Sequence, residues 1–366
     1  MNTNPANRWR RHVRPKDAIG VAQLAALATT QVMTVTEQFH LAILVATGIT
    51  PESSLGWFHR GTQLVYAGLK LTPKAAELIL QPIAKNLARH DSNDSRGRIQ
   101  TLAAMNGVLG DQLALSHNPL ATRFELFTPP QPSTQLPTQA APQHHIIFLH
   151  GLCMDEFAWQ QSDLLAQLSN EKTLISFLRY NSGLPIRQNA ELMVDLLAQL
   201  EKPGLSFSLV GHSMGGLIAH QAWHIAASQK REFLSTINKI ICIGSPHLGA
   251  PMAKLGHWLE ETLHSNTITR PFTYLTKLRS VGIKDLQHGF YSDLTSADTE
   301  FYCLAGELPA KLAGVKEQLG DGLVPESSAL GLPQAHHCVI ENVSHLGLLT
   351  DPRVMDEIVQ WLQPQR

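Results

Sequence analysis

The chain has 366 residues, of which 43% are hydrophobic and 16% are charged. A chain of this size and composition can bury a sizeable core beneath a lightly charged surface. Its 29 lysines and arginines nearly balance its 30 aspartates and glutamates, which argues against a protein built to bind nucleic acid. No run of about 18 apolar residues is present, so no segment is predicted to span a membrane.

The amino terminus begins with a group of basic residues that imitates the start of a signal peptide: Arg8, Arg10, Arg11, Arg14 and Lys16. Polar residues interrupt the apolar stretch that follows, and its periodicity continues beyond any cleavage site. The pattern therefore predicts a basic lead into an amphipathic helix, and hence a cytoplasmic protein.

The first third of the chain is predicted to be helical. Apolar residues recur every three or four positions over 17–48, which is typical of one face of a long helix. Thr50-Pro51 and Thr72-Pro73 resemble helix starts, and Ile99 to Leu115 gives a further helix. Residues 1–115 form a predicted helical domain that carries no reactive constellation. Packing or homodimer formation is its favoured role, and a lid or a peripheral membrane contact is the alternative.

Residues 116–366 alternate between predicted strands and helices, which predicts an α/β fold with a mostly parallel, doubly wound sheet. The predicted strands are 121–127, 145–149, 173–178, 207–210, 237–243, 300–304 and 338–343, and the predicted helices are 159–168, 190–200, 214–227 and 351–362. A proline-rich stretch at 129–142 is predicted to be a loop rather than a linker. The segment 247–298 interrupts the alternation and includes an amphipathic helix at 252–263, so it is predicted to be a cap.

Ser213 lies between two glycines at a predicted strand-to-helix turn, in the sequence Gly211-His212-Ser213-Met214-Gly215-Gly216. This arrangement predicts a nucleophile elbow, where the turn is so tight that the flanking positions require glycine. Because ligands of such sheets bind at the carboxyl ends of the strands, the Ser213 hydroxyl is expected at the reactive edge. A glycine-rich turn with an inert serine is the alternative.

A serine hydroxyl needs a base to take its proton, and the base needs an acid to orient it. In doubly wound hydrolases these residues follow in the order serine, acid, histidine, each on a loop after a strand. Asp321 and His345 satisfy that order. Asp351 is the rival acid, but it follows His345 and resembles the start of the last helix. Ser213, Asp321 and His345 are therefore the predicted catalytic residues.

The predicted oxyanion hole consists of two backbone N–H groups, those of Leu152 and Met214. Met214 begins the helix after the elbow, and Leu152 follows the first parallel strand. Four further residues near strand ends are candidates for substrate binding: His150, His212, His247 and Leu248. His150 is more easily explained as a brace for its loop than as a group that transfers a proton. His247 is explained as a residue that shapes its turn or lines the pocket.

Five motifs in order resemble the α/β-hydrolase superfamily: Leu149-His150-Gly151, Gly211 to Gly216, Gly244 to Pro251, Gly320 to Pro325 and Ser344-His345-Leu346. The likeness covers residues 118–366 and is greatest to bacterial lipases and to the lipase-like domain of the PGAP1 group of GPI inositol-deacylases. The resemblance implies hydrolysis of carboxylic esters, including lipid esters, through an acyl-enzyme and without a metal or an organic cofactor. Extracellular lipases of this type usually carry a signal peptide, and the pattern of this chain departs from theirs in this respect. This departure argues against a role in extracellular fat digestion.

Two rival functions use the same residues differently. A thioesterase or acyltransferase would share the triad, and a non-catalytic hydrolase-like module would use the helical domain to bind a partner or a membrane. The four cysteines, Cys153, Cys242, Cys303 and Cys338, have neither disulfide nor zinc spacing, and are expected to be small core residues.

Overall fold

A computed structural model describes residues 17, 20, 96–128, 142–159, 162–251, 254–256, 280–293, 298–309 and 320–363. The predicted helices at 17–48 and after Thr50 and Thr72, the proline-rich loop and most of the helix at 252–263 lie outside the described residues. The chain divides into two compact units, one of residues 1–122 and 259–280 and the other of 123–258 and 281–366.

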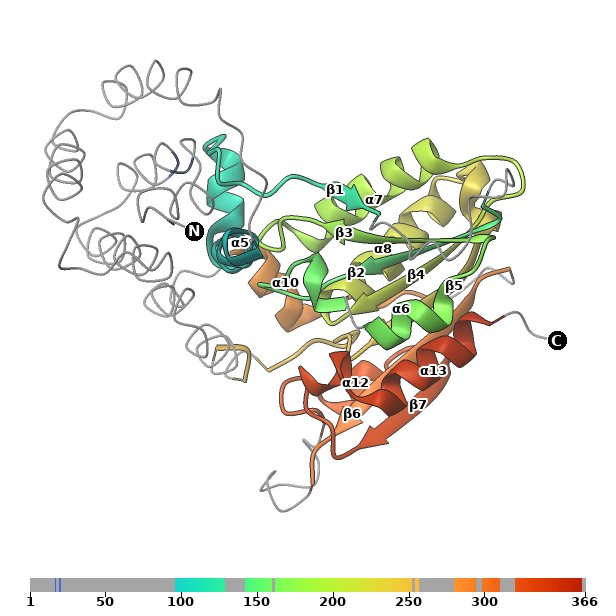
Figure 1. Cartoon of the computed structure of the whole chain (residues 1–366). Coiled ribbons are helices and arrows are strands. Elements are labelled where there is room, and N and C mark those ends of the chain that lie inside the picture. Colours follow the sequence, from blue (N-terminus) through green and yellow to red (C-terminus); the bar gives the residue numbers. More distant parts are fainter. Residues whose placement is uncertain are drawn as a thin grey trace, which may run out of the picture. The chain divides into compact units, whose positions relative to one another are not determined.

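The second unit is built on one seven-stranded sheet in the order β1-β3-β2-β4-β5-β6-β7 (Figure 1). The strands are β1 (Glu125–Phe127), β2 (His144–Leu149), β3 (Thr173–Arg179), β4 (Ser206–His212), β5 (Ile237–Ile243), β6 (Glu300–Glu307) and β7 (His336–Glu341). Only β1 is antiparallel to its neighbour, and the other five pairings are parallel. The predicted mostly parallel sheet is confirmed.

Helices cover both faces of the sheet, as Figure 1 shows. The helices α7 (Ile186–Leu200) and α8 (Met214–Ser228) pack together on one face, and α6 (Ser162–Leu168) and α13 (Pro352–Leu362) pack together on the other. The short helices within the described residues of this unit are η3 (Glu156–Trp159), η4 (Glu232–Thr236), α10 (Val281–His288), α12 (Glu326–Ala329) and η7 (Gly347–Leu349).

The core beneath α6 and α13 follows from the two-residue period of the strands. Ile146 and Phe148 of β2, Ile175 and Phe177 of β3, and Val210 of β4 all belong to this buried cluster. The helices contribute Trp159, Leu164, Val354 and Ile358. Because the strands are covered on both faces, their sequences are nearly continuous apolar runs, as expected for a parallel sheet.

Element boundaries differ from prediction where a turn residue or a cap decides them. Helix α7 begins at Ile186, earlier than the predicted residue 190, because Pro185 occupies its N-cap position. Strand β7 ends at Glu341, and Asn342 adopts a positive φ of 61°, so the predicted strand end at 343 lies in a turn. Asp351 caps α13 by accepting the Arg353 N–H, which confirms that it begins the last helix.

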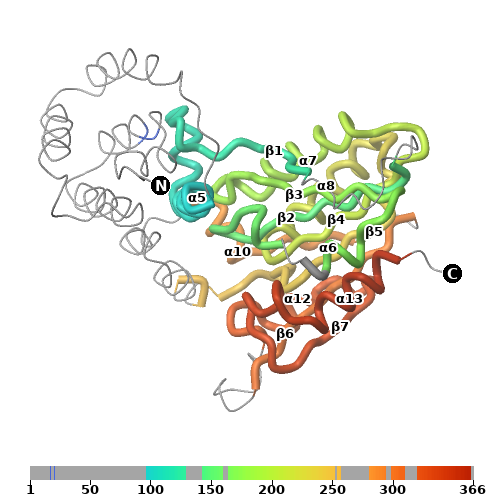
Figure 2. The backbone as a smooth tube through the Cα atoms, viewed as in Figure 1, coloured from blue at the N-terminus to red at the C-terminus, as the bar shows by residue number. Residues whose placement is uncertain are grey.

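The sheet brings distant parts of the chain to a shared edge. Figure 2 shows the chain passing from the green central strands to the orange β6 and the red β7 at one side of the sheet. The carboxyl ends of β2, β4, β5, β6 and β7 therefore lie along one edge, because these strands are parallel. The loops after these ends carry Leu152, Ser213, Asp321 and His345.

The described part of the first unit centres on helix α5 (Arg96–Leu115), which confirms the predicted helix at 99–115. The Arg98 guanidinium pairs with the Asp17 carboxylate at 2.6 Å. Ser280 Oγ donates to the Gly107 carbonyl at 2.7 Å, and Asn118 Nδ2 donates to the Gly20 carbonyl at 2.9 Å. These polar contacts join residues that lie far apart in the sequence.

Candidate active site

Ser213 stands at the junction of β4 and α8 with φ of 53° and ψ of −119°. A non-glycine residue with positive φ is strained, and such strain is held only where the surroundings fix it. The Ser213 N–H donates to the Ile243 carbonyl at 2.8 Å, and the Gly216 N–H donates to the Ser213 carbonyl at 3.1 Å. The serine therefore occupies the strained turn that a nucleophile elbow requires.

The glycines around Ser213 are required by close backbone packing. A Cβ on Gly211 would lie 2.3 Å from the Gly215 carbonyl carbon, and one on Gly215 would lie 2.5 Å from the Leu149 oxygen. A Cβ on Gly216 would meet Ser245 Oγ at 2.0 Å. The steric demand predicted at 211 and 215 is confirmed, and it extends to position 216.

Asp321 and His345 form a buried hydrogen-bonded pair. His345 Nδ1 lies 2.6 Å from Asp321 Oδ2, and both residues are 2% exposed. The other carboxylate oxygen, Oδ1, accepts the N–H groups of Leu323 and Val324 at 3.0 and 2.8 Å. These bonds fix the carboxylate, so that it can orient the imidazole and stabilise its charged form.

The pair lies beside the ends of β4 and β5, next to the elbow. A Cβ on Gly244 would lie 3.1 Å from Asp321 Oδ2 and 3.3 Å from His345 Cε1. The His212 ring, directly before Ser213, has its centroid 4.7 Å from that of His345. Parallel strand pairing thus brings the Asp321–His345 pair next to the residue that precedes Ser213, although Ser213 and His345 are 132 residues apart in the sequence (345 minus 213).

The loop after β2 lies against the serine. A Cβ on Gly151 would lie 3.3 Å from Ser213 Cβ. The Gly151 carbonyl faces His150 Nδ1 at 2.8 Å and accepts the Met154 N–H at 3.3 Å. In a trans peptide the N–H points opposite to the carbonyl, so the Leu152 N–H is turned away from these two groups. Met214 is the first residue of α8, where an N–H has no acceptor within the helix.

His150 and His212 are buried and neutral. Burial lowers the pKa of His150 to about 4. It also lowers the pKa of His212 well below its usual value, and the neighbouring His345 adds to the shift. The His150 ring stacks on Tyr180 at 4.1 Å, and the Tyr180 hydroxyl donates to the His150 carbonyl. These contacts hold the loop after β2, so bracing is the role that the local geometry favours for His150.

The other two predicted substrate-binding residues differ in exposure. His247 is buried, with Nε2 at 3.8 Å from Cys303 Sγ and its ring against that of His220. Leu248 is 57% exposed, and its N–H donates to Ser328 Oγ at 3.1 Å. Leu346, which directly follows His345, is 41% exposed. Leu346 is not among the predicted substrate-binding residues, although its place directly after His345 is visible in the sequence.

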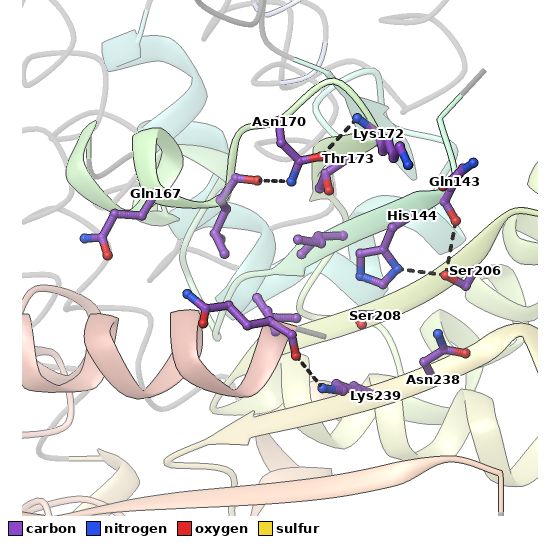
Figure 3. Close-up of a pocket in the computed structure, with 14 residues that line it drawn as sticks. Gln143, His144, Gln167, Asn170, Lys172, Thr173, Ser206, Ser208, Asn238 and Lys239 are labelled. Carbon is purple, nitrogen blue, oxygen red and sulfur yellow. Dashed lines mark hydrogen bonds between the residues drawn. The ribbon is translucent and has the colours of Figure 1, made fainter. Parts of the chain in front are cut away.

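A pocket of about 400 Å³ opens at the opposite, amino edge of the sheet (Figure 3). Its polar groups bond largely to one another and to the backbone. His144 Nδ1 lies 2.9 Å from Ser206 Oγ, and Lys239 Nζ donates to the Trp361 and Gln363 carbonyls. Since the loops that carry Ser213, Asp321 and His345 follow the other ends of the strands, this pocket is separate from those three residues.

Sequence reasoning missed several supports of the site. Gly244 adopts a positive φ of 58° beneath the Asp321–His345 pair. Ser182 Oγ accepts the Cys153 N–H at 3.1 Å, and Cys153 has a φ of 60°. A buried ion pair joins Glu156 to Arg179 behind this loop. Apart from Gly244, which begins one of the five motifs, these residues have no motif of their own, because their roles depend on contacts between different strands.

Within the described ranges, no three histidine, cysteine or acidic side chains are grouped closely enough to bind a metal ion. None of the four cysteines, all of which lie within the described residues, is in a disulfide, and Cys242, Cys303 and Cys338 lie on β5, β6 and β7, as predicted. Of the helices that the structure describes, none is long and apolar enough to cross a membrane.

Sheet order, helices on both faces and a strained serine between β4 and α8 define an α/β-hydrolase fold. Residues 184–299 match the family described as the PGAP1-like alpha/beta domain. The resemblance stated from the motifs is confirmed over this segment, which spans α7 to the residue before β6.

Solved structures similar to this chain include lipases, esterases and thioesterases. The lipase BlEst2 of Bacillus licheniformis in its mature form is 21% identical, with a TM-score of 0.47, over 66% of this chain and 98% of that one. Naproxen esterase of Bacillus subtilis is 16% identical, with a TM-score of 0.43, over 74% and 100%. The RedJ thioesterase of Streptomyces coelicolor is 15% identical, with a TM-score of 0.42, over 64% and 96%. The comparison with curated proteins found no match.

Proposed function

We propose that this protein is a serine hydrolase that cleaves carboxylic esters through an acyl-enzyme. The observation that carries the proposal is the buried hydrogen bond between Asp321 and His345, beside a serine held at positive φ. An acid, an imidazole and a strained serine at one sheet edge are needed together for nucleophilic catalysis. A binding module has no need of all three.

In the proposed reaction, the Ser213 hydroxyl attacks the ester carbonyl while His345 Nε2 removes its proton. The Leu152 and Met214 N–H groups stabilise the oxyanion, and loss of one such donor costs about 3 kcal/mol of barrier. The alcohol leaves with the proton from His345. Water then attacks the acyl-enzyme with His345 as the base, which releases the acid and restores Ser213. Asp321 holds the imidazole throughout.

Of the predicted substrate-binding residues, His150, His247 and Leu248 lie in the loops after β2 and β5, and His212 ends β4. Leu248, which is 57% exposed, offers an apolar surface for the acyl group. His150 and His247 are buried within these loops, which favours a role in shaping the substrate site over direct contact with the substrate. The proposed substrates are small-molecule or lipid esters, and acyl chain length is the property that Leu248 would influence.

A fluorophosphonate probe tests the nucleophile directly. We expect the wild-type protein to be labelled and to hydrolyse p-nitrophenyl esters, and Ser213→Ala to lose both properties. Ser245→Ala is the matched control, because Ser245 is also buried after a central strand and its Oγ has no hydrogen-bond partner among the described residues. Labelling that persists in Ser213→Ala would reject the proposal.

The same assay separates the rival substrate class. Turnover of acyl-CoA and of p-nitrophenyl esters with equal acyl length is measured side by side. A higher kcat/KM for the oxygen ester supports an esterase, whereas a preference for acyl-CoA would assign a thioesterase with the same triad. No turnover and no labelling across both panels would favour a non-catalytic module.

A further inference from the structure

His212 connects the strand that carries the serine to the loop that carries the base. It is the last residue of β4 and is fully buried. Its Nε2 lies 3.0 Å from the carbonyl oxygen of His345, 133 residues away. We propose that His212 is a positioning residue that holds His345 in its working place. The kinetic part of this inference rests on the proposed esterase function.

The protonation of His212 follows from its partner. A carbonyl oxygen can only accept a hydrogen bond. The His212 Nε2 therefore carries the proton, and its N–H donates a hydrogen bond to the backbone carbonyl of His345. Burial keeps the ring neutral, since it lowers the His212 pKa. The second nitrogen, Nδ1, has no partner among the described residues. An unsatisfied buried acceptor is unfavourable, so a less polar residue would fit this place better if packing were the sole requirement.

The ring of His212 packs against two neighbours, Trp159 and Gly151. Trp159 meets it edge-on with ring centroids 6.4 Å apart, and Trp159 is itself fixed by donating Nε1–H to the Leu149 carbonyl at 3.0 Å. Gly151 is the second neighbour, because a Cβ added to it would lie 3.0 Å from His212 Nδ1. The ring cannot swing away without moving these neighbours, so its donor is a fixed reference point.

The His345 backbone is held from two directions. Its N–H donates to the Asp321 carbonyl at 2.9 Å, and its carbonyl accepts from His212. The first bond comes from the loop that carries the acid, and the second comes from the element that carries the serine. His212 therefore sets the position of the base relative to the nucleophile, and an error of about 1 Å in such a position can cost about 100-fold in rate.

Two substitutions separate positioning from packing. His212→Phe keeps a buried ring but removes the donor, whereas His212→Gln places an amide N–H near the position of Nε2. The control is His145→Phe, because His145 is equally buried on β2 and bonds through Nε2 to Ser176 Oγ at 2.8 Å, away from the triad. Each variant is measured for kcat and KM with a short soluble ester, for Tm, and for the low-field proton resonance of the Asp321–His345 hydrogen bond.

We expect His212→Phe to lower kcat by about 100-fold with KM changed less than about threefold, and to broaden or abolish the low-field resonance. His212→Gln should recover most of both properties. His145→Phe should keep the resonance and kcat, even where its Tm falls as far as that of His212→Phe. A resonance and a kcat that survive in His212→Phe would overturn the inference, and so would equal losses in both phenylalanine variants.

The resonance does not depend on ester turnover, which keeps the two proposals distinguishable. If the wild-type protein cleaves no ester but the resonance disappears selectively in His212→Phe, the positioning role stands and the proposed function fails. If ester hydrolysis depends on Ser213 but not on His212, the proposed function stands and the positioning role fails.

Discussion

The two edges of the sheet use the same residue types in different ways. At the amino edge, His144 bonds to Ser206, and His145, further along β2, bonds to Ser176. At the carboxyl edge, His150 and His212 bond only to backbone carbonyls through one nitrogen, and the second nitrogen of each has no partner among the described residues. Ser213 and Cys153 adopt positive φ at this edge.

This difference between the two edges shows where the fold contains interactions that lower its stability. Histidine and serine satisfy one another at the amino edge, where Ser208, whose Oγ has no partner among the described residues, is the exception. At the carboxyl edge, strained backbone and unsatisfied nitrogens are gathered around a buried acid–base pair. Such a concentration is expected at a functional site, because strain and unpaired polar groups persist only where the surroundings fix them.

The largest expected effect is the loss of kcat on substitution of Asp321, the proposed acid at the carboxyl edge. Asp321→Ala removes the acceptor for His345 Nδ1, so the imidazole loses both its orientation and the charge that stabilises its protonated form. We expect kcat for ester hydrolysis to fall by about 10,000-fold. Steady-state kinetics at saturating substrate measure the change.

Asp351→Ala is the matched control for this variant. Asp351 caps α13 through the Arg353 N–H, so its loss should cost about 1 kcal/mol of unfolding free energy and leave kcat unchanged. A large loss of kcat in Asp351→Ala, together with normal activity in Asp321→Ala, would show that Asp351 is the acid and that the assignment of Asp321 is wrong.

One buried histidine at each edge should make the free energy of unfolding depend on pH. His145 and His150 each have a pKa lowered by burial from 6.5 to about 4. Between these values the unfolded chain binds a proton that the folded protein does not. The stability is therefore complete above pH 6.5 and is lost as the pH falls towards 4, by about 3 kcal/mol for each residue. Urea unfolding at pH 7 and at pH 4.5 measures the loss.

Substitution of either histidine distinguishes the edges within this experiment. His145→Phe and His150→Phe should each make the unfolding free energy less dependent on pH. Only His150→Phe should also lower kcat, because it removes the Nδ1–H that holds the Gly151 carbonyl. An unchanged pH dependence in both variants would show that folding lowers the pKa of neither ring.

The smallest effects concern glycines at the two ends of β4. Gly215→Ala would place a Cβ 2.5 Å from the Leu149 oxygen and 2.6 Å from the His150 oxygen, and such overpacking should cost about 3 kcal/mol and disturb the loop of Leu152. Gly204 has a φ of 80° and nothing within 4 Å of an added Cβ, so Gly204→Ala should cost about 1 kcal/mol. Thermal unfolding and kcat are measured for both, and kcat should fall only for Gly215→Ala.

Much of the second unit was predictable from local sequence. Strands such as Ile237–Ile243 are continuous apolar runs, and the glycines on either side of Ser213 are dictated by a turn of known geometry. Boundaries such as Ile186 and Glu341 were missed by a few residues, because a cap or a turn decides them and a hydrophobic period does not.

The sequence by itself determined the order of strands and helices, the serine elbow and the candidate acid and base, because hydrophobic period and turn chemistry act over a few residues. Only the tertiary structure decided that Asp321 Oδ2 lies 2.6 Å from His345, that His212 donates across 133 residues, and that Gly244 and Gly216 must lack a side chain. These features depend on which strands lie side by side. Strand order is fixed by packing of the whole sheet, and no local pattern records it.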